Sequence, residues 1–365
     1  MDRPLPSLPQ SPAVAGRLDF PRWFIGFAIV FFALITLAAQ EQALGLPYIE
    51  GEQLLRHSAV LNDTARNPWN YRVFSEWVLE PVLRASAALG LSHSVSYAYL
   101  FVRAVQNLLI FSMAWVFYRS SGLSQQRSLL GLIILSFCFT HVFYNADLSV
   151  NTYFDLLFFL VAGWLIVRGR YEWIVPLSLM AALNRETGIY IPVMAASSLL
   201  FVDGRRQKGA KRQAIAAMIA ACLFVGVTVA LRLTLHKSAG WQNDWGNQPG
   251  LKTLLMNFKD INTIVGVPLT LSLLPLLPLV RFRSLPKLFQ AWYLLMVPFW
   301  IAIHFIMVYA KETRYYLVPI AVVLIPAAIW PMSARETVEA EGLSRDPERA
   351  LSERETTVIG RAGLR

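Results

Sequence analysis

Long uninterrupted apolar stretches are the feature of this 365-residue sequence that most restricts its fold. Three of the clearest run from Trp23 to Gln40, from Val95 to Tyr118 and from Lys287 to Ala310. A stretch of about 18 or more apolar residues can cross a bilayer as a helix. Composition agrees, because 56% of the residues are hydrophobic and 15% are charged, against roughly half and a quarter in soluble domains. The sequence therefore predicts an all-α integral membrane protein.

The apolar blocks predict about ten transmembrane helices. Their ranges are 22–40, 95–118, 128–145, 152–168, 172–184, 188–203, 213–235, 262–280, 288–309 and 315–331. The fifth and sixth are short, so 172–203 forms either two short spans or one re-entrant pair, which membranes tolerate only where the backbone faces protein or a cavity. The first block lacks a following small-residue cleavage site, so we interpret it as a retained span and not as a signal peptide.

The basic residues predict the orientation of the chain. With the N-terminus inside, the inner segments are rich in cations such as Arg119, Arg127, Arg205 and Arg206, as cytoplasmic loops of membrane proteins are. We therefore expect both termini in the cytoplasm, and a location in a bacterial inner membrane. The expected organisation is a cytoplasmic segment at 1–21, a transmembrane domain at 22–331 with a long first outer loop at 41–94, and a flexible charged tail at 332–365.

Polar residues gather in the segments that this orientation places outside. They are Glu50, Glu52, Asp63 and Arg72 in the first outer loop, Asp147 in the second, Asn184-Arg185-Glu186-Thr187-Gly188 between the fifth and sixth spans, and Lys311-Glu312-Thr313-Arg314-Tyr315-Tyr316 in the last. Within the spans, Arg103, His141, Asp155, Arg232 and His304 lie toward the same side. Charges in lipid are costly and usually face a cavity or a partner. Structural pairing explains any one of them, but their convergence favours an outward-facing polar cavity.

The first outer loop also contains a predicted amphipathic helix. Asn67 can cap it, and Pro68 suits a first helical position. The apolar residues that follow at helical spacing are Val73, Phe74, Trp77 and Val78. A helix of this kind lies in the membrane interface. Arg72 is one turn from Glu76, and it either pairs with that residue or projects into the cavity.

Three short motifs carry a resemblance to a known family. The motif Lys311-Glu312-Thr313-Arg314-Tyr315-Tyr316, followed by Pro319, resembles the late His-Lys-Glu-x-Arg-Phe/Tyr…Pro motif of lipid-phosphosugar-dependent mannosyltransferases, with Ala310 in place of the His. Those enzymes belong to the multi-span C-type (GT-C) glycosyltransferase superfamily. The tracts Asn67-Pro68-Trp69-Asn70-Tyr71-Arg72-Val73 and Leu183-Asn184-Arg185-Glu186-Thr187 are similar to segments of bacterial membrane proteins of that architecture. The span layout and the long first outer loop with its juxtamembrane helix also match.

The resemblance implies a GT-C-like fold and transfer of a sugar from a polyprenyl-phosphate donor. The acceptor would be a glycan, a lipid or a protein on the outer, periplasmic face, in the synthesis of cell-surface glycans. An acceptor hydroxyl loses a proton as it attacks the anomeric carbon, so a carboxylate base is needed nearby. The leaving lipid phosphate needs cationic donors to hold its charge. Membrane lipids are expected partners as well.

The candidate residues for this chemistry lie in the outer segments. The resemblance places the acidic residue in the first outer loop, where Glu50 stands in place of the expected Asp. The candidate bases are Glu50, then Glu52 and Asp63, with Asp147 and Asp155 as rivals. The candidate phosphate clamp is Arg314 with Lys311, then Arg185 and Arg72; further candidates for substrate contacts are Arg103, Glu186, Glu312 and Tyr315.

Other functions have less support in the sequence. No Asp-x-Asp occurs in an outer loop, the histidines lack ligand spacing and no nucleotide-binding signature occurs, so no metal or cofactor is expected. No basic patch interleaved with aromatic residues indicates nucleic acid. Cys138 and Cys222 fall inside predicted spans and are interpreted as packing residues. Two alternatives stay open: a transporter or flippase of a lipid-linked glycan, which the broken segment around Asn184 fits, and a non-catalytic membrane subunit.

Overall fold

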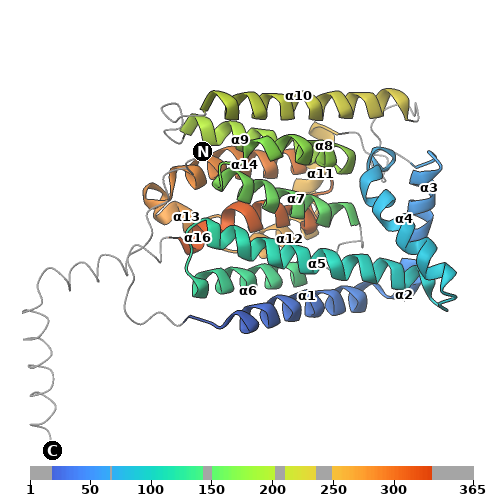
Figure 1. Ribbon diagram of the computed structural model, residues 1–365. Coiled ribbons are helices and arrows are strands. Elements are labelled where there is room, and N and C mark those ends of the chain that lie inside the picture. Colours follow the sequence, from blue (N-terminus) through green and yellow to red (C-terminus); the bar gives the residue numbers. More distant parts are fainter. Residues whose placement is uncertain (1–18, 66–67, 143–149, 202–209, 236–248, 331–365) are drawn as a thin grey trace, which may run out of the picture.

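The long helices run side by side in one bundle (Figure 1). The computed structural model describes residues 19–65, 68–142, 150–201, 210–235 and 249–330, and every regular element in these ranges is helical. Five of the described helices are long and apolar enough to cross a membrane: α1 (Arg22–Leu44), α5 (Ser94–Ser120), α7 (Val150–Val167), α10 (Ala210–Thr234) and α14 (Lys287–Met307). The all-helical prediction is confirmed, and these five helices indicate an integral membrane protein.

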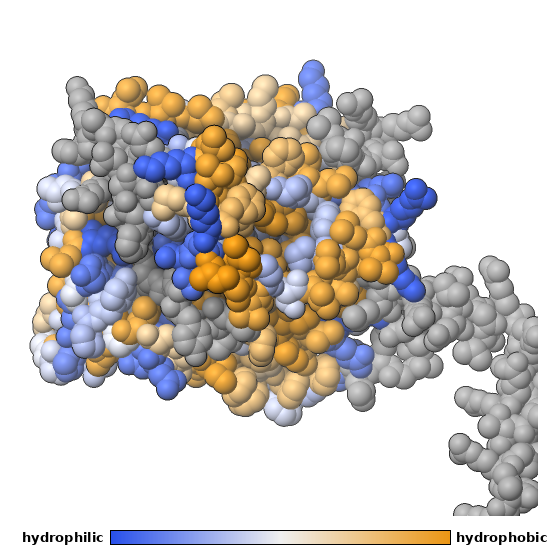
Figure 2. Space-filling model, turned by 180° about the vertical axis from the view of Figure 1, so that it is seen from behind, coloured by the Kyte–Doolittle hydropathy of each residue, from blue (hydrophilic) through white to orange (hydrophobic). Residues whose placement is uncertain are grey.

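The bundle has an interior and a periphery that differ in exposure. In the most apolar part of α7, 78% of the residues are buried, against 28% for α1 and 22% for α10. The outer helices present large apolar side chains such as Trp23 and Phe27 to the surroundings, which suits contact with lipid. Apolar residues dominate the middle of the face in Figure 2, and hydrophilic residues are more frequent toward its two ends.

The C-terminal part of the described chain lies entirely in the interior. Every residue from Thr313 to Ile329 is buried. This segment consists of η8 (Thr313–Tyr316), α15 (Leu317–Pro319), the π-helix η9 (Ile320–Leu324) and α16 (Ile325–Ile329). It packs against α7, α14 and α6 (Gln125–Val142). Its first turn therefore brings Arg314 into the protein interior.

Residues 171–201 form an antiparallel pair of short helices. The elements are η4 (Tyr171–Trp173), α8 (Ile174–Asn184), η5 (Glu186–Ile189) and α9 (Tyr190–Phe201). Tyr171 and Ser198 share a hydrogen bond of 2.7 Å between their hydroxyl groups, so the start of α8 lies beside the end of α9. Helices of 11 and 12 residues are roughly 16–18 Å long. The turn at Arg185 is thus the tip of a hairpin shorter than a hydrocarbon core.

One expected span is interrupted. The range 262–280 contains α12 (Ile261–Leu271) and α13 (Leu277–Val280), preceded by α11 (Leu251–Lys259). The break begins at Ser272, whose φ of 49° lies in the left-handed region. That conformation cannot continue a right-handed helix. The 3₁₀ turn η7 (Phe282–Ser284) then leads to α14.

The first outer loop is mostly helical. Its elements are α2 (Leu46–Tyr48), the π-helix η1 (Ile49–Gln53), α3 (Leu54–Leu61), η2 (Trp69–Tyr71) and α4 (Val73–Ala88). A helix is found in this part of the loop as α4, but its predicted start at Pro68 is wrong. Pro68 precedes the 3₁₀ turn η2, and Arg72, with φ −98° and ψ 56°, precedes the first turn of α4. Asn67 lies outside the described residues.

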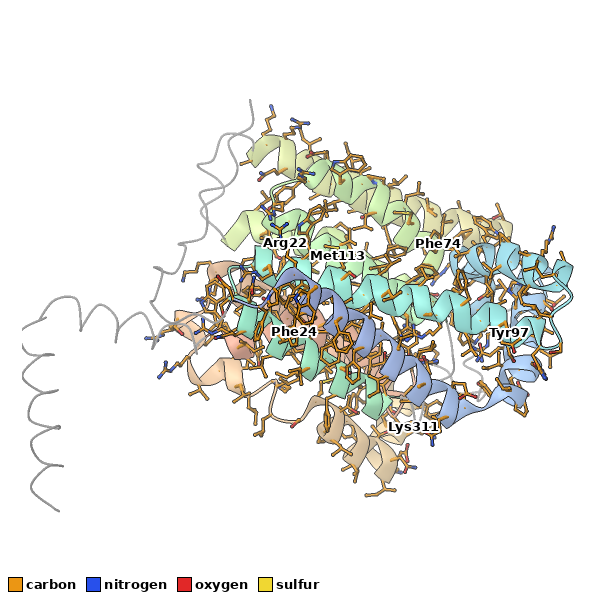
Figure 3. The ribbon with its side chains drawn as sticks, turned by 60° about the horizontal axis from the view of Figure 1, so that its bottom comes forward. Arg22, Phe24, Phe74, Tyr97, Met113 and Lys311 are labelled. Carbon is orange, nitrogen blue, oxygen red and sulfur yellow. The ribbon has the colours of Figure 1, made fainter. Side chains whose placement is uncertain are left out.

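The two ends of the bundle carry different groups. Figure 3 places Arg22, at the start of α1, and Lys311 toward opposite ends of that helix, with Phe74 and Tyr97 on the side of Lys311. Helices α3 and α4 stand across this second end (Figure 1). The polar motifs of the sequence are found at this end.

Candidate functional site

Three sequence motifs meet at this end in what we call the arginine cluster. It is defined by Arg72, Asp155, Arg185, Glu186, Glu312, Arg314 and Tyr315. Arg72 precedes α4, Asp155 lies in the second turn of α7, Arg185 and Glu186 form the tip of the α8–α9 hairpin, and the others belong to η8 or the residue before it. Tertiary packing alone joins these segments, which are separated by up to about 240 residues in the sequence.

Arg72 joins the first outer loop to the hairpin. Its Nη2 lies 3.1 Å from Oε2 of Glu186. The Arg72 guanidinium also lies 5.1 Å from the centroid of the Trp69 ring, and Arg56 lies 4.0 Å from the same ring. These distances permit cation–π attraction. The non-helical backbone at Arg72 thus directs its side chain toward the hairpin and away from Glu76. Of the two alternatives expected for Arg72, pairing with Glu76 is therefore not found.

Arg185 joins the hairpin to α7. Its Nη1 lies 4.0 Å from Oδ2 of Asp155 and donates a hydrogen bond of 3.3 Å to Thr152. The hydroxyl of Thr187 donates to the same Asp155 oxygen at 2.6 Å. Asp155 is fully buried, and Arg185 is 5% exposed. A buried carboxylate is tolerated when it is paired and hydrogen-bonded, so the hairpin tip and α7 hold each other in register.

Tyr315 is shared by two arginines. The guanidinium groups of Arg185 and Arg314 lie 4.6 and 5.3 Å from the centroid of its ring. Its hydroxyl donates a hydrogen bond of 2.7 Å to Glu312, which is also the ion-pair partner of Arg314. On the other side, the ring of His304 lies 5.0 Å from that of Tyr315. Tyr315 therefore offers a cation–π contact to both arginines and links η8 to the hairpin tip.

The cluster has hydrogen-bonding capacity that the described residues do not use. Among the described part of the chain, Nε of Arg72, Nε of Arg185, Oε1 of Glu186 and Oδ1 of Asp155 are buried and have no hydrogen-bond partner. Beside them is a cavity of about 10 Å³, enough for about one water molecule. Its lining includes Arg72, Arg185, Glu186, Thr228 and Arg232. Buried polar groups are normally satisfied, so this concentration of unused groups is typical of a binding site.

The other predicted contacts lie beside the cluster or apart from it. Arg103 is buried between α1, α5 and α7, where Nε donates to Gln40 at 2.7 Å and Nη1 donates to Gln106 at 3.3 Å. Gln106 donates in turn to the carbonyl of Val150, at the start of α7. Arg103 thus supports the helix that carries Asp155. The ammonium group of Lys311 lies 5.4 Å from the centroid of the Tyr309 ring.

The candidate bases of the first outer loop are not brought to the arginines. Glu50 accepts hydrogen bonds of 2.9 Å from Ser96 and from the ring of His93, when that nitrogen is protonated. These bonds lower the pKa of Glu50 and tie its carboxylate to the start of α5. Glu52 is exposed on η1, and Asp63 follows the end of α3 with φ 54°. Asp147 and the side chain of His141 lie outside the described part of the structure.

Sequence reasoning did not single out several residues that complete the cluster. Thr152 and Thr187 hold Asp155 and Arg185, and Trp69 lies beside Arg56 and Arg72. Thr187 and Trp69 lie within two of the motifs, close in sequence to Arg185 and Arg72. That closeness is the feature of the sequence from which their role could have been predicted. Arg56 carries no such signal, because only the packing of α3 against η2 brings it near Trp69.

No protein-family model matches this chain, and neither a curated protein nor a solved structure matches it. The resemblance to C-type glycosyltransferases therefore rests on the three motifs and the helical layout. The functional argument depends on the chemistry of the cluster itself.

Proposed function

We propose that this chain is a membrane glycosyltransferase that moves a sugar from a polyprenyl-phosphate donor to an acceptor on the outer face of the membrane. The observation that carries the proposal is the convergence of Arg72, Arg185 and Arg314, from three distant segments, on a buried site that also holds carboxylates. Guanidinium groups bind phosphate oxygens through paired hydrogen bonds. The chain thus combines a phosphate clamp with proton acceptors in one place.

The clamp would stabilise the leaving group. As the bond between the anomeric carbon and the phosphate oxygen breaks, the electron pair stays on the lipid phosphate. The three arginines hold that negative charge in a buried setting, where fixed donors act more strongly than in water. Because the phosphate is already a good leaving group, the site needs cationic donors and no general acid.

Glu186 is our choice for the base, because it lines the cavity and Asp155 does not. The Glu186 side chain is 25% exposed and bonded to Arg72. A donor phosphate that takes over Arg72 releases this carboxylate. Glu186 can then accept the proton of the acceptor hydroxyl while the hydroxyl oxygen attacks the anomeric carbon. Asp155, fully enclosed beside Arg185 and Thr187, is assigned the positioning of Arg185.

Replacement of Glu186 by the donor phosphate as the partner of Arg72 is also consistent with the size of the cavity. A space for about one water does not accept a phosphate while the Arg72–Glu186 pair is closed. The base is therefore occupied until the donor arrives, which would limit the loss of sugar to water.

The test uses the purified chain in liposomes with polyprenyl phosphates that carry labelled mannose, glucose or arabinose, and with outer-surface glycolipid extract as acceptor. We expect transfer from one of the donors. Arg185→Gln and Glu186→Gln should each reduce it about 100-fold or more. The matched control is Arg168→Gln, because Arg168 is an exposed arginine that follows the end of α7 and lies outside the cluster and its cavity.

Binding of sugar-free polyprenyl phosphate separates the role of Arg185, which is to hold the phosphate, from that of Glu186, which is to act as the base. Arg185→Gln should lose this binding, and Glu186→Gln should keep it, since the base is not needed to hold the phosphate. If Glu186→Gln keeps full transfer and Glu50→Gln loses it, the base is Glu50 of the first outer loop. Flipping of the donor lipid by the wild type, with no transfer from any donor, would favour the transporter instead.

A further inference from the structure

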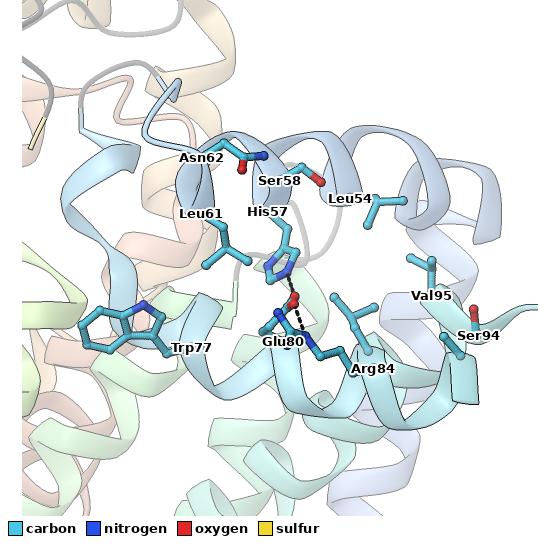
Figure 4. A pocket seen from close by; sticks show the side chains of 12 residues that line it. Leu54, His57, Ser58, Leu61, Asn62, Trp77, Glu80, Arg84, Ser94 and Val95 are labelled. Carbon is cyan, nitrogen blue, oxygen red and sulfur yellow. Dashed lines mark hydrogen bonds and ion pairs between the residues drawn. The ribbon is translucent and has the colours of Figure 1, made fainter. Parts of the chain in front are cut away.

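A second cavity, larger than the one at the arginine cluster, lies outside that cluster. This α3–α4 groove has a volume of about 770 Å³ and is bounded by α3, α4 and the start of α5. Figure 4 shows Trp77 at one end, Ser94 and Val95 at the other, and His57 with Glu80 between them. Binding sites for small molecules commonly have volumes of about 300–1,000 Å³. The groove is therefore large enough for a ligand of two or three sugar units.

The lining of the groove combines apolar and uncharged polar groups. Its apolar side chains include Leu54, Leu61, Leu83 and Val95, and its uncharged polar residues are Ser58, Asn62 and Ser94. Trp77 has 55% of its surface exposed. An exposed indole ring offers a flat apolar face together with an N–H donor. A ligand that fits this lining has both an apolar face and many hydroxyl groups.

The charged residues of the groove balance one another. The ring nitrogens of His57 lie 2.7 Å from Glu76 and 2.8 Å from Glu80, and Arg84 donates to Glu80 at 2.6 Å. Burial opposes the charged form of His57, but the hydrogen bonds to the two glutamates outweigh it and raise the pKa of His57. Two carboxylates thus face one guanidinium and one imidazolium. The groove has no excess charge to attract an ion.

We infer that the α3–α4 groove binds the acceptor of the reaction and that this acceptor is a neutral glycan. The inference rests on the proposed function. Acyl chains would cover the polar groups of Glu80, Arg84 and Asn62 and remove them from water without offering new hydrogen bonds, which is costly. An anion would meet Glu80, and a cation would meet Arg84. A neutral glycan instead stacks a ring face on Trp77 and offers hydroxyl groups, which can both donate and accept, to Glu80, Arg84 and Asn62.

The place of the groove suits an acceptor. Trp77 lies on α4 about 7.5 Å along the helix axis from Arg72, and Leu61 and Asn62, at the end of α3, line the groove on the same side as Trp77 (Figure 4). The cluster and the groove are thus neighbours on one helix. An acceptor held against Trp77 would extend its terminal hydroxyl toward the Arg72–Glu186 pair.

Saturation-transfer NMR tests the groove directly. The purified full chain in nanodiscs is mixed with cellobiose, mannobiose or chitobiose as neutral probes. We expect saturation transfer to at least one of them, its loss in Trp77→Ala and Asn62→Ala, and its recovery in Trp77→Phe. The matched control is Trp23→Ala. Trp23 is an exposed tryptophan near the start of α1, at the end of the bundle away from the groove, so its loss should not change the saturation transfer.

Kinetics of transfer give a second readout. Trp77→Ala should raise the KM for the acceptor about tenfold and leave kcat unchanged, because it removes binding that is equal in the ground and transition states. Arg185→Gln should instead lose transfer and keep saturation transfer to the disaccharide. If the wild type transfers no sugar, the proposed function fails, and the NMR experiment still decides whether the groove binds neutral glycans.

Two results would overturn the inference. One is the absence of saturation transfer from all three disaccharides. The other is saturation transfer and an acceptor KM that are the same in Trp77→Ala, Asn62→Ala and the wild type. The second result would assign Trp77 to the membrane interface, where exposed tryptophans are common.

Discussion

The arginine cluster and the α3–α4 groove are neighbours on α4 but are built in opposite ways. In the cluster, Arg185 and Asp155 are 5% and 0% exposed, and their contacts join segments far apart in the sequence. In the groove, Arg84 is 79% exposed and its partner Glu80 is one turn away on the same helix. The integrity of the cluster depends on the whole bundle, whereas that of the groove depends mainly on two helices and their junction with α5.

The difference indicates where the loss of a charged residue should reduce the free energy of unfolding most. Removing one member of a buried pair leaves an uncompensated charge, which costs about 3–5 kcal/mol. An exposed pair contributes about 0–1 kcal/mol. Substitutions of similar chemistry should therefore have very different consequences at the two sites, and this contrast can be tested.

The largest effect is expected for Arg185→Ala. It should abolish transfer and reduce the free energy of unfolding by about 3–5 kcal/mol, because Asp155 loses its buried partner. The double variant Arg185→Ala/Asp155→Ala should recover much of the stability and none of the activity. Unfolding of the purified protein in mixed micelles measures the first quantity, and the liposome assay measures the second. The Asp155→Ala single variant completes the cycle, and a double variant whose loss equals the sum of the two single losses would mean that the two residues are not coupled.

The second largest effect is expected for Gly188→Ala, at the hairpin tip that carries Arg185. A Cβ at Gly188 would lie 2.7 Å from Cβ of Ala181 and 2.8 Å from the Phe224 ring, so Gly188→Ala should destabilise the protein by about 1–3 kcal/mol. Gly226→Ala on α10 is the matched control, since nothing lies within 4 Å of its added Cβ, and it should be neutral or slightly stabilising. The same micelle unfolding compares them. Equal melting of both variants would show that α8, η5 and α10 pack less closely than described.

A smaller and pH-dependent effect is expected at the groove. The pKa of His57 is raised, so its bonds to Glu76 and Glu80 stabilise the junction of α3 and α4 fully below the ordinary value of 6.5, and the contribution is lost as the pH rises through the raised pKa. The pKa of Glu80 is lowered by its bonds to His57 and Arg84, so its contribution is present above the ordinary value of 4.5 and lost as the pH falls through the lowered pKa.

Amide hydrogen exchange of α3 and α10, corrected for intrinsic rates, measures this dependence. Protection of α3 should be greatest between pH 4.5 and 6.5 and should fall on the alkaline side, while that of α10, which contains no acidic residue or histidine, stays constant. His57→Ala should remove the alkaline fall. A fall that persists in this variant would assign the dependence to another titrating group.

The smallest effect is expected for Arg84→Gln. Because Arg84 is exposed and its pair lies on one helix turn, the free energy of unfolding should change by about 0.5 kcal/mol or less. Binding of the disaccharide should weaken only slightly, since Glu80 keeps its bond to His57. A loss as large as that of Trp77→Ala would give the guanidinium a direct role in recognition.

The helical fold could be predicted because its signal is local. Continuous apolar stretches specify helices such as α1, α5 and α14, and their ends agree within a few residues with the predicted ones. The break at Ser272 and the start of α4 at Val73 could not be predicted. Both depend on backbone conformations that tertiary packing selects, and apolar composition carries no information about them.

For the candidate site, the gathering of Arg72, Arg185 and Arg314 at one end could be inferred from the motifs and the charge pattern. The partners of these residues could not. Glu50 and Asp155 are both acidic residues near predicted span ends, and only the register of α7 against the hairpin places Asp155, and not Glu50, beside Arg185. Spacing along the chain does not encode that register.

The short α8–α9 hairpin has a consequence for how the protein enters the membrane. Neither helix, with 11 and 12 residues, reaches the length of about 17–25 residues that a spanning helix needs. The translocon therefore cannot release α8 alone into lipid. The hairpin has to enter as one unit beside α7 and be sealed by α10, which packs along both of its helices. Biogenesis of this chain is in that sense a concerted step of four helices, and a ribosome that stalls before α10 would leave Arg185 exposed to quality control.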